Sequence, residues 1–78
     1  MKAYVIKRDD GKYLSTDHNT VYHYFYWGNN LLNCCHFDTK EFATDFLQVR
    51  LQIEKHLGKN RFDNCKVVPV EIKECINE

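Results

Sequence analysis

The sequence is poor in glycine and proline, has no excess of either charge, and contains no long hydrophobic run. Three glycines and one proline occur in 78 residues, and the glycines stand far apart, so no glycine-rich loop could cradle a phosphate. Lysine plus arginine equals aspartate plus glutamate, at 11 each. A general binder of nucleic acid or of an anionic membrane needs a basic excess, so this balance argues against both. No apolar segment has the length of a membrane span or a signal peptide. We therefore expect a cytoplasmic protein with no membrane partner.

The four cysteines do not have the spacing of a disulfide framework or a zinc knuckle. Cys34 and Cys35 are neighbours, and no Cys-x-x-Cys pair occurs. In an extended segment, adjacent side chains point to opposite sides, so residues 34–36 would not converge on one ion. Reduced thiols are the rule in the cytoplasm, and we predict no metal and no cofactor. The residues that zinc could otherwise use are His23, Cys34, Cys35, His36, His56, Cys65 and Cys75.

No residue pattern in the chain is typical of an enzyme. A cysteine–histidine pair can act as nucleophile and base, but nothing in the sequence places a base beside an activated thiol. The neighbouring carboxylates of Asp9 and Asp10 are explained by the turn that they form with Gly11. We predict that the protein is not an enzyme.

Alternation of side chains indicates several strands. Asp-Gly at residues 10–11 lies between two β-prone runs, which is a strong hairpin signal. Pro69 cannot donate a ladder hydrogen bond, so either the last strand lies at an edge of the sheet or its Pro69 position faces away from the neighbouring strand. The segment from Leu31 does not alternate cleanly and is expected to be a short, less regular strand. The predicted strands are 2–8, 12–16, 21–27, 31–37 and 66–76.

One helix is predicted over residues 39–57. Asp38 and Glu41 have the spacing of a capping box, and Phe37 and Phe42 flank the cap in the manner of a hydrophobic staple. Gly58 supplies the stop. Two apolar stripes run along this helix. The first stripe is Phe42, Phe46, Val49, Ile53 and Leu57, and the second stripe is Ala43, Leu47 and Leu51.

These elements predict one α+β domain over residues 1–78, with the order β-β-β-β-α-β. An antiparallel sheet of four or five strands would carry one helix on one face. The first stripe is expected to face the sheet. The strand residues expected to meet it, or their alternates in register, are Val5, Phe25, Trp27, Val68, Val70 and Ile72. The other sheet face would stay open.

The aromatic run at 21–27 is the best indication of a binding site. Tyr22, Tyr24 and Tyr26 share one side of the strand, and we call them the tyrosine row. Tyrosine gives a large contact area at small entropic cost and is common at binding hot spots. The alternative is that the tyrosines simply stabilise a half-exposed sheet.

The second stripe and the loop aspartates are further candidate contacts. Leu47 and Leu51 would form a partner or homodimer surface if the first stripe faces the core, although such residues more often belong to the core. Asp9, Asp10 and Asp17 lie in predicted loops and could engage a basic patch on a target.

Several short motifs resemble those of small uncharacterised proteins from phages and prophages of Gram-positive bacteria. They are Tyr4-Val5-Ile6-Lys7, Gly11-Lys12-Tyr13-Leu14, Phe37-Asp38-Thr39-Lys40-Glu41 with Ala43, and Lys66-Val67-Val68-Pro69-Val70-Glu71-Ile72. These motifs encode turns, caps and core rather than chemistry. The resemblance implies context: such accessory proteins, anti-CRISPR inhibitors among them, often bind and block one host protein.

Together these observations predict a phage-type accessory protein that binds and inhibits a host protein in the host-cell cytoplasm, with a CRISPR-type nuclease complex as one such target. The alternative is a small module that binds single-stranded nucleic acid, since aromatic rows on open sheets can stack bases.

Overall fold

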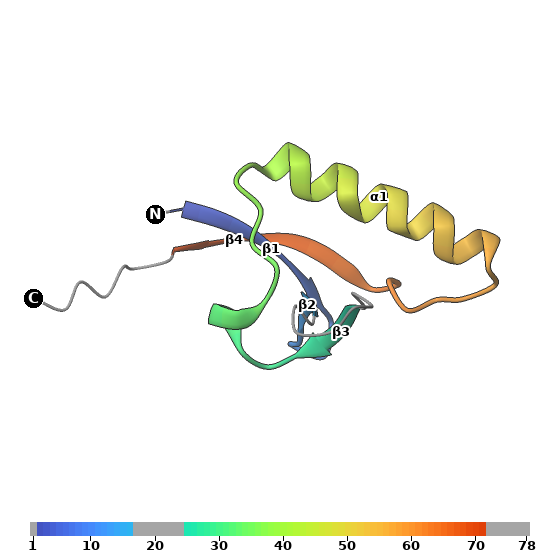
Figure 1. Cartoon of the computed structure of the whole chain (residues 1–78), viewed down its shortest axis with the longest axis horizontal. Helices are drawn as coiled ribbons and strands as arrows, with labels where there is room; N and C mark the ends of the chain where they lie inside the picture. The colour runs from blue at the N-terminus through green and yellow to red at the C-terminus, as the bar shows by residue number, and fades with distance from the viewer. Residues whose placement is uncertain (1, 17–24, 72–78) are drawn as a thin grey trace, which may run out of the picture.

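The computed structural model describes residues 2–16 and 25–71. In this part of the chain, four strands form one antiparallel sheet in the order β3-β2-β1-β4, and one α-helix packs on one face of it (Figure 1). The predicted α+β class is confirmed, and β4 with Pro69 lies at an edge as expected. No helix in these residues is long and apolar enough to cross a membrane. The elements are β1 (Lys2–Arg8), β2 (Tyr13–Thr16), β3 (Phe25–Gly28), the 3-10 helix η1 (Leu31–Asn33), α1 (Lys40–His56) and β4 (Cys65–Glu71).

The predicted hairpin between β1 and β2 is confirmed. The Arg8 N–H donates to the Lys12 carbonyl over 2.8 Å, and the Gly11 N–H donates to the Arg8 carbonyl over 2.9 Å. Gly11 has a φ of +86°, a conformation that costs glycine little and other residues more. The turn therefore depends on Gly11, as the sequence predicts.

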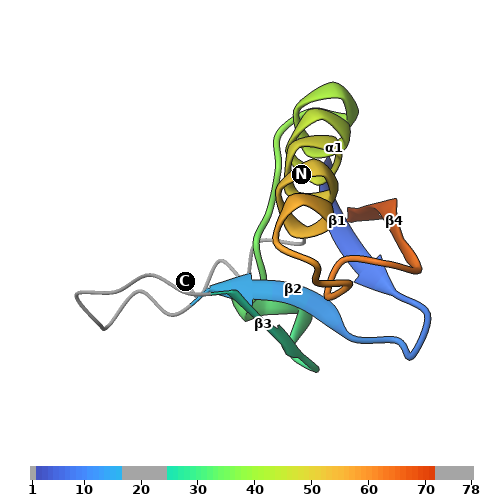
Figure 2. The same cartoon turned by 90° about the vertical axis from the view of Figure 1, so that its right-hand side faces the viewer.

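Residues 31–37 do not form the predicted strand. The Asn30 side chain accepts a hydrogen bond from the Leu32 N–H over 2.9 Å and starts η1 instead. The chain then makes two isolated bridges, from Cys34 to Ser15 and from Phe37 to Tyr4. Strands β1 and β2 pair close to their turn, where Lys7 lies opposite Tyr13, and the two strands diverge beyond it (Figure 2). Residues 34–37 lie in the gap, hydrogen-bonded to both strands.

The helix begins one residue later than predicted. Its N-cap is Thr39, whose Oγ1 accepts a hydrogen bond from the Phe42 N–H over 3.1 Å, so Asp38 is not the cap. The predicted contact of Phe37 with Phe42 is present, with ring centroids 5.8 Å apart. The Leu57 N–H still bonds to the Ile53 carbonyl, and Gly58 follows with a φ of +70°. Gly58 therefore ends the helix as expected.

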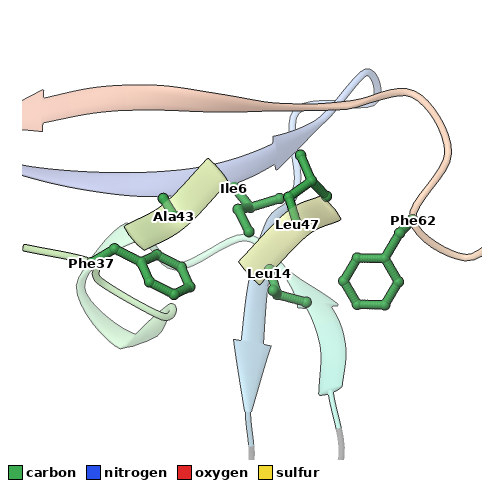
Figure 3. Close-up of a cluster of buried hydrophobic side chains, with 6 residues drawn as sticks. All are labelled: Ile6, Leu14, Phe37, Ala43, Leu47 and Phe62. Carbon is green, nitrogen blue, oxygen red and sulfur yellow. The ribbon is translucent and has the colours of Figure 1, made fainter. Parts of the chain in front are cut away.

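The helix faces the sheet with its second stripe, which contradicts the prediction. Ala43 and Leu47 are buried, and Leu51 packs against the core. The burial of Leu47 and the half-buried position of Leu51 against the core argue against the partner surface predicted for them. In the first stripe, Phe46 is half-buried, and its other members have exposed fractions of 65% for Phe42, 54% for Val49, 39% for Ile53 and 57% for Leu57. Figure 3 shows the core side chains Ile6, Leu14, Phe37, Ala43, Leu47 and Phe62 converging between helix and sheet.

The strands contribute alternate residues to this core. Phe25 and Trp27 of β3 pack against it, as predicted. In β1 and β4, the cross-strand pair Ile6 and Val67 occupies the helix side, so their neighbours Val5 and Val68 point the other way. The alternate register therefore holds for these two strands. Ile72 lies outside the described residues.

Candidate binding surfaces

Tyr26 lies on the sheet face that points away from the helix. Its neighbours Phe25 and Trp27 pack into the core, so alternation turns Tyr26 outward, with an exposed fraction of 42%. Its ring lies over Gly28: a Cβ placed there would be 3.2 Å from the Tyr26 Cε2 atom. A residue with a side chain at position 28 would displace this ring. Tyr22 and Tyr24, the other members of the tyrosine row, lie outside the described residues.

Three further side chains share this face with Tyr26. Tyr13 pairs with Gly28 across β2 and β3, and Lys7 pairs with Tyr13 on one side and with Lys66 on the other. The Lys7 ammonium lies 5.7 Å from the centroid of the Tyr13 ring, within range of a cation–π interaction. We call Lys7, Tyr13, Tyr26 and Lys66 the lysine–tyrosine face.

The sheet face is open only in part. On the same side of the sheet, Ala3, Val5 and Ser15 have exposed fractions of 4%, 0% and 2%. The prediction of an open face therefore holds for the end nearer the Asp9–Lys12 turn and fails at the other end. A partner that binds this side of the sheet would contact the lysine–tyrosine face and the turn beside it.

The two turn aspartates differ in availability. The Asp10 carboxylate accepts hydrogen bonds from Arg8 Nε and Nη2 over 3.1 and 2.6 Å, and another from the Lys12 N–H. The bonds from Arg8 lower the pKa of the Asp10 carboxyl to about 2. The Arg8 guanidinium also lies 4.8 Å from the centroid of the Trp27 ring. Asp10 thus acts within the hairpin, which argues against its predicted role as a partner contact, whereas Asp9 is exposed and stays a prediction.

A buried ionic cluster was not predicted from the sequence. Glu54 is 1% exposed and lies on the core side of α1. Its Oε1 accepts hydrogen bonds from Arg61 Nη2 and Nε over 2.7 and 3.1 Å, and Arg50 Nη2 lies 3.6 Å away. The bonds from Arg61 hold the pKa of Glu54 below its ordinary value. Because the carboxylate is sealed from solvent, this cluster is structural.

Aromatic rings enclose one side of the ionic cluster. The Arg50 guanidinium lies 5.2 Å from the centroid of Phe25 and 5.4 Å from that of Phe62. Phe62 is 3% exposed and contacts Trp27, with ring centroids 5.6 Å apart. Phe62 and Arg61 come from a segment that reads as a polar connection. A lone aromatic residue within that polar segment is the signal that could have indicated a core contact.

The described cysteines have the character of packed thiols. Burial raises the pKa of Cys34 and of Cys65 to about 11 each, and it raises the pKa of Cys35. A thiol with a raised pKa stays protonated at neutral pH and is a poor nucleophile. Within residues 2–16 and 25–71, no three metal-ligating side chains come together.

Comparison of the chain with protein-family models, curated proteins and solved structures finds no match. Two exposed surfaces of the described residues are candidate contact sites, the lysine–tyrosine face of the sheet and the first stripe of α1.

Proposed function

We propose that the chain is a non-enzymatic protein-binding domain whose contact surface is the lysine–tyrosine face. The observation that supports this proposal is the outward position of Tyr26, 42% exposed on the sheet face opposite the helix. Tyr13 lies diagonally across the strand pair from it, within reach of a shared contact.

Tyrosines at such a site would act as anchors for a partner. Each has a large apolar ring, a polar hydroxyl and few rotatable bonds, so ordering it on binding costs little entropy. The Lys7 and Lys66 ammonium groups on the same face would favour an acidic rim on the partner. The partner would thus be recognised by aromatic burial at the centre and by charge at the edge.

The resemblance to phage accessory proteins supports a host protein as the partner. In this proposal, the domain occupies a functional surface of that protein and blocks it sterically, and a defence nuclease complex of the CRISPR type is one candidate. The mechanism needs no chemistry from the domain, only a rigid sheet that holds its side chains in place.

The proposal can be tested by affinity capture from a bacterial host lysate, with nuclease treatment, read by mass spectrometry. One dominant protein should be retained, and its affinity should fall about 30-fold for Tyr26→Ala, the scale of a hot-spot residue. Leu32→Ala is the control, because Leu32 is an exposed apolar residue of η1. Equal retention by Tyr26→Ala and the parent chain would refute this surface as the contact site.

Single-stranded nucleic acid is the second candidate ligand. Lys7 and Lys66 are a direct cross-strand pair beside Tyr13, so phosphates and bases could both find contacts there. A titration with a labelled oligonucleotide should then show affinity that falls steeply with salt, since counterions are released on binding. No binding even at low salt would exclude this function.

A further inference from the structure

The first stripe of α1 forms an exposed apolar surface that the core does not use. Phe42, Val49, Ile53 and Leu57 are all among the exposed large hydrophobic residues. A shallow hollow between Phe42, Phe46 and Val49 also includes Asp45. At about 100° per residue, the stripe is centred roughly a third of a turn from the buried second stripe. A contiguous apolar surface of this kind is typical of an interaction site.

We propose that this surface pairs with a second copy of the chain, the two α1 helices lying antiparallel across a two-fold axis. The spacing of the stripe supports a helical partner. Phe42, Phe46, Val49 and Ile53 are four, three and four residues apart, which is the alternation of a coiled-coil repeat. The partner that packs best against such a stripe is a second helix that carries an apolar stripe of the same period.

The antiparallel orientation matches the stripe to itself. In that orientation Phe42 of one copy lies opposite Ile53 of the other, and Phe46 lies opposite Val49. The two-fold axis repeats both contacts, because the same surface on each copy must be complementary to itself. The layers formed by these four residues are then apolar. Phe46 is half-buried against Phe25 and Phe37, so it ties the contact to the core.

The charges at the two ends of the helix also favour the antiparallel orientation. Near its start the chain has the acidic Asp38, Glu41 and Asp45 with Lys40, and near its end it has His56 and Lys59. Glu54 is already paired with Arg61, and Lys55 lies on the side of the helix away from the stripe. Antiparallel pairing brings the acidic end of one copy beside the basic end of the other, which is favourable, whereas parallel pairing would oppose like charges. The helix dipoles are also favourably opposed in this arrangement.

The size of the stripe determines how strongly the two copies are expected to bind. A helix of 17 residues is about 25 Å long, and one helix face buries less than the roughly 800 Å² per partner of a standard interface. We therefore expect a weak dimer with a dissociation constant on the order of 10 μM.

Sedimentation velocity on the full chain, from about 1 μM to 1 mM, tests the association. The mass should rise from 9.4 kDa towards twice that value. Val49→Asp should keep the chain monomeric at every concentration, because each new carboxylate would lie against the apolar stripe of the other copy. Gln48→Asp is the matched control, since Gln48 is exposed on α1 outside the stripe, and it should dimerise as the parent does. Circular dichroism checks that both variants fold.

A complementary pair of variants tests the orientation. Phe42→Lys and Ile53→Glu should each be monomeric alone, whereas an equal mixture should form a heterodimer. Only antiparallel helices bring the introduced ammonium of one chain beside the introduced carboxylate of the other.

Three results would overturn the proposal. The first is a parent chain that stays monomeric at 1 mM, about a hundred times the expected dissociation constant of roughly 10 μM. The second is an equal loss of association in Val49→Asp and Gln48→Asp. The third is a mixture of the two complementary variants that stays monomeric. If the parent chain stays monomeric while Val49→Asp loses a captured host protein, the occupant of the stripe is that protein. The proposal does not rest on the lysine–tyrosine face, so Tyr26→Ala should leave dimerisation unchanged.

Discussion

Leu47→Ala is expected to lower the free energy of unfolding by about 3 kcal/mol, the typical cost of a cavity at a buried leucine. Leu47 is 7% exposed and lies among Ile6, Leu14 and Phe62 (Figure 3). A domain of 78 residues has a total stability of roughly 4–12 kcal/mol at 0.05–0.15 kcal/mol per residue. The variant should therefore lose a large share of that stability, as measured by urea unfolding followed by circular dichroism.

Val49→Ala is the control for this experiment. Val49 is 54% exposed on the first stripe, so its truncation should change stability by no more than about 0.5 kcal/mol. Unfolding should be measured at low micromolar protein concentration, so that self-association does not contribute to the stability. A larger loss for Val49→Ala than for Leu47→Ala would mean that the helix faces the sheet with its other side.

Glu54→Gln should have the second large effect, a marked fall in Tm. The substitution keeps the size of the side chain but removes the charge that Arg61 and Arg50 contact. The Arg50 Nε is already buried with no hydrogen-bond partner in the described residues. The charge-assisted hydrogen bonds at the buried carboxylate are then lost, which is destabilising, although the Arg50 and Arg61 side chains, 24% and 53% exposed, keep some contact with water. Glu41→Gln, at an exposed glutamate of the same helix, should leave Tm nearly unchanged.

The same substitution should change how stability depends on pH. The folded protein holds the pKa of Glu54 below its ordinary value of 4.5. The carboxylate therefore contributes stability that is fully present above pH 4.5 and is lost as pH falls through the lower folded-state pKa. Glu54→Gln should therefore reduce the loss of stability at acid pH, which we call the acid limb of the curve of stability against pH.

Asp10→Asn serves as the comparison for the acid limb. The Asp10 pKa is lowered from 3.8 to about 2, so its contribution is lost in the same direction as pH falls. Asp10 is exposed, however, and solvent screens its interaction with Arg8, so Asp10→Asn should flatten the limb less. An acid limb that is unchanged in Glu54→Gln would contradict the role assigned to this carboxylate.

The parts of the fold that the sequence predicts well are those decided by neighbouring residues. The Asp10-Gly11 turn needs only a glycine that tolerates positive φ. The helix start is displaced by one residue, from Asp38 to Thr39, because both side chains can cap and only the chain path selects between them.

The orientation of α1 could not be predicted because it depends on residues distant in sequence. Both stripes have helical spacing, and the first stripe is the more apolar. The buried side contains Glu54, which is tolerated only because Arg61 reaches it from the following loop. The sequence pattern does not show that Arg61 reaches Glu54, so it favours the stripe without a charged residue as the buried side of the helix.

The candidate site was predicted in the same partial way. Alternation along β3 is a local property, and it places Tyr26 on the outer face correctly. The burial of Val5 and Ser15 on that face depends on packing across the sheet, as does the bridging position of Cys34 and Phe37. The sequence pattern places Arg8 in a strand and Asp10 in a turn, so it does not indicate the ion pair between them.

The central place of β1 in the sheet has a kinetic consequence. Its hairpin with β2 is local and can form within microseconds, but its other edge pairs with β4, where Lys2 meets Glu71 across nearly the whole described chain. Pairing so distant in sequence must first overcome the entropy of closing a long loop, which slows folding. Until β4 arrives, the hydrogen-bonding edge of β1 is open to other chains. The slow step of folding is therefore also the step at which newly made molecules are most prone to aggregate.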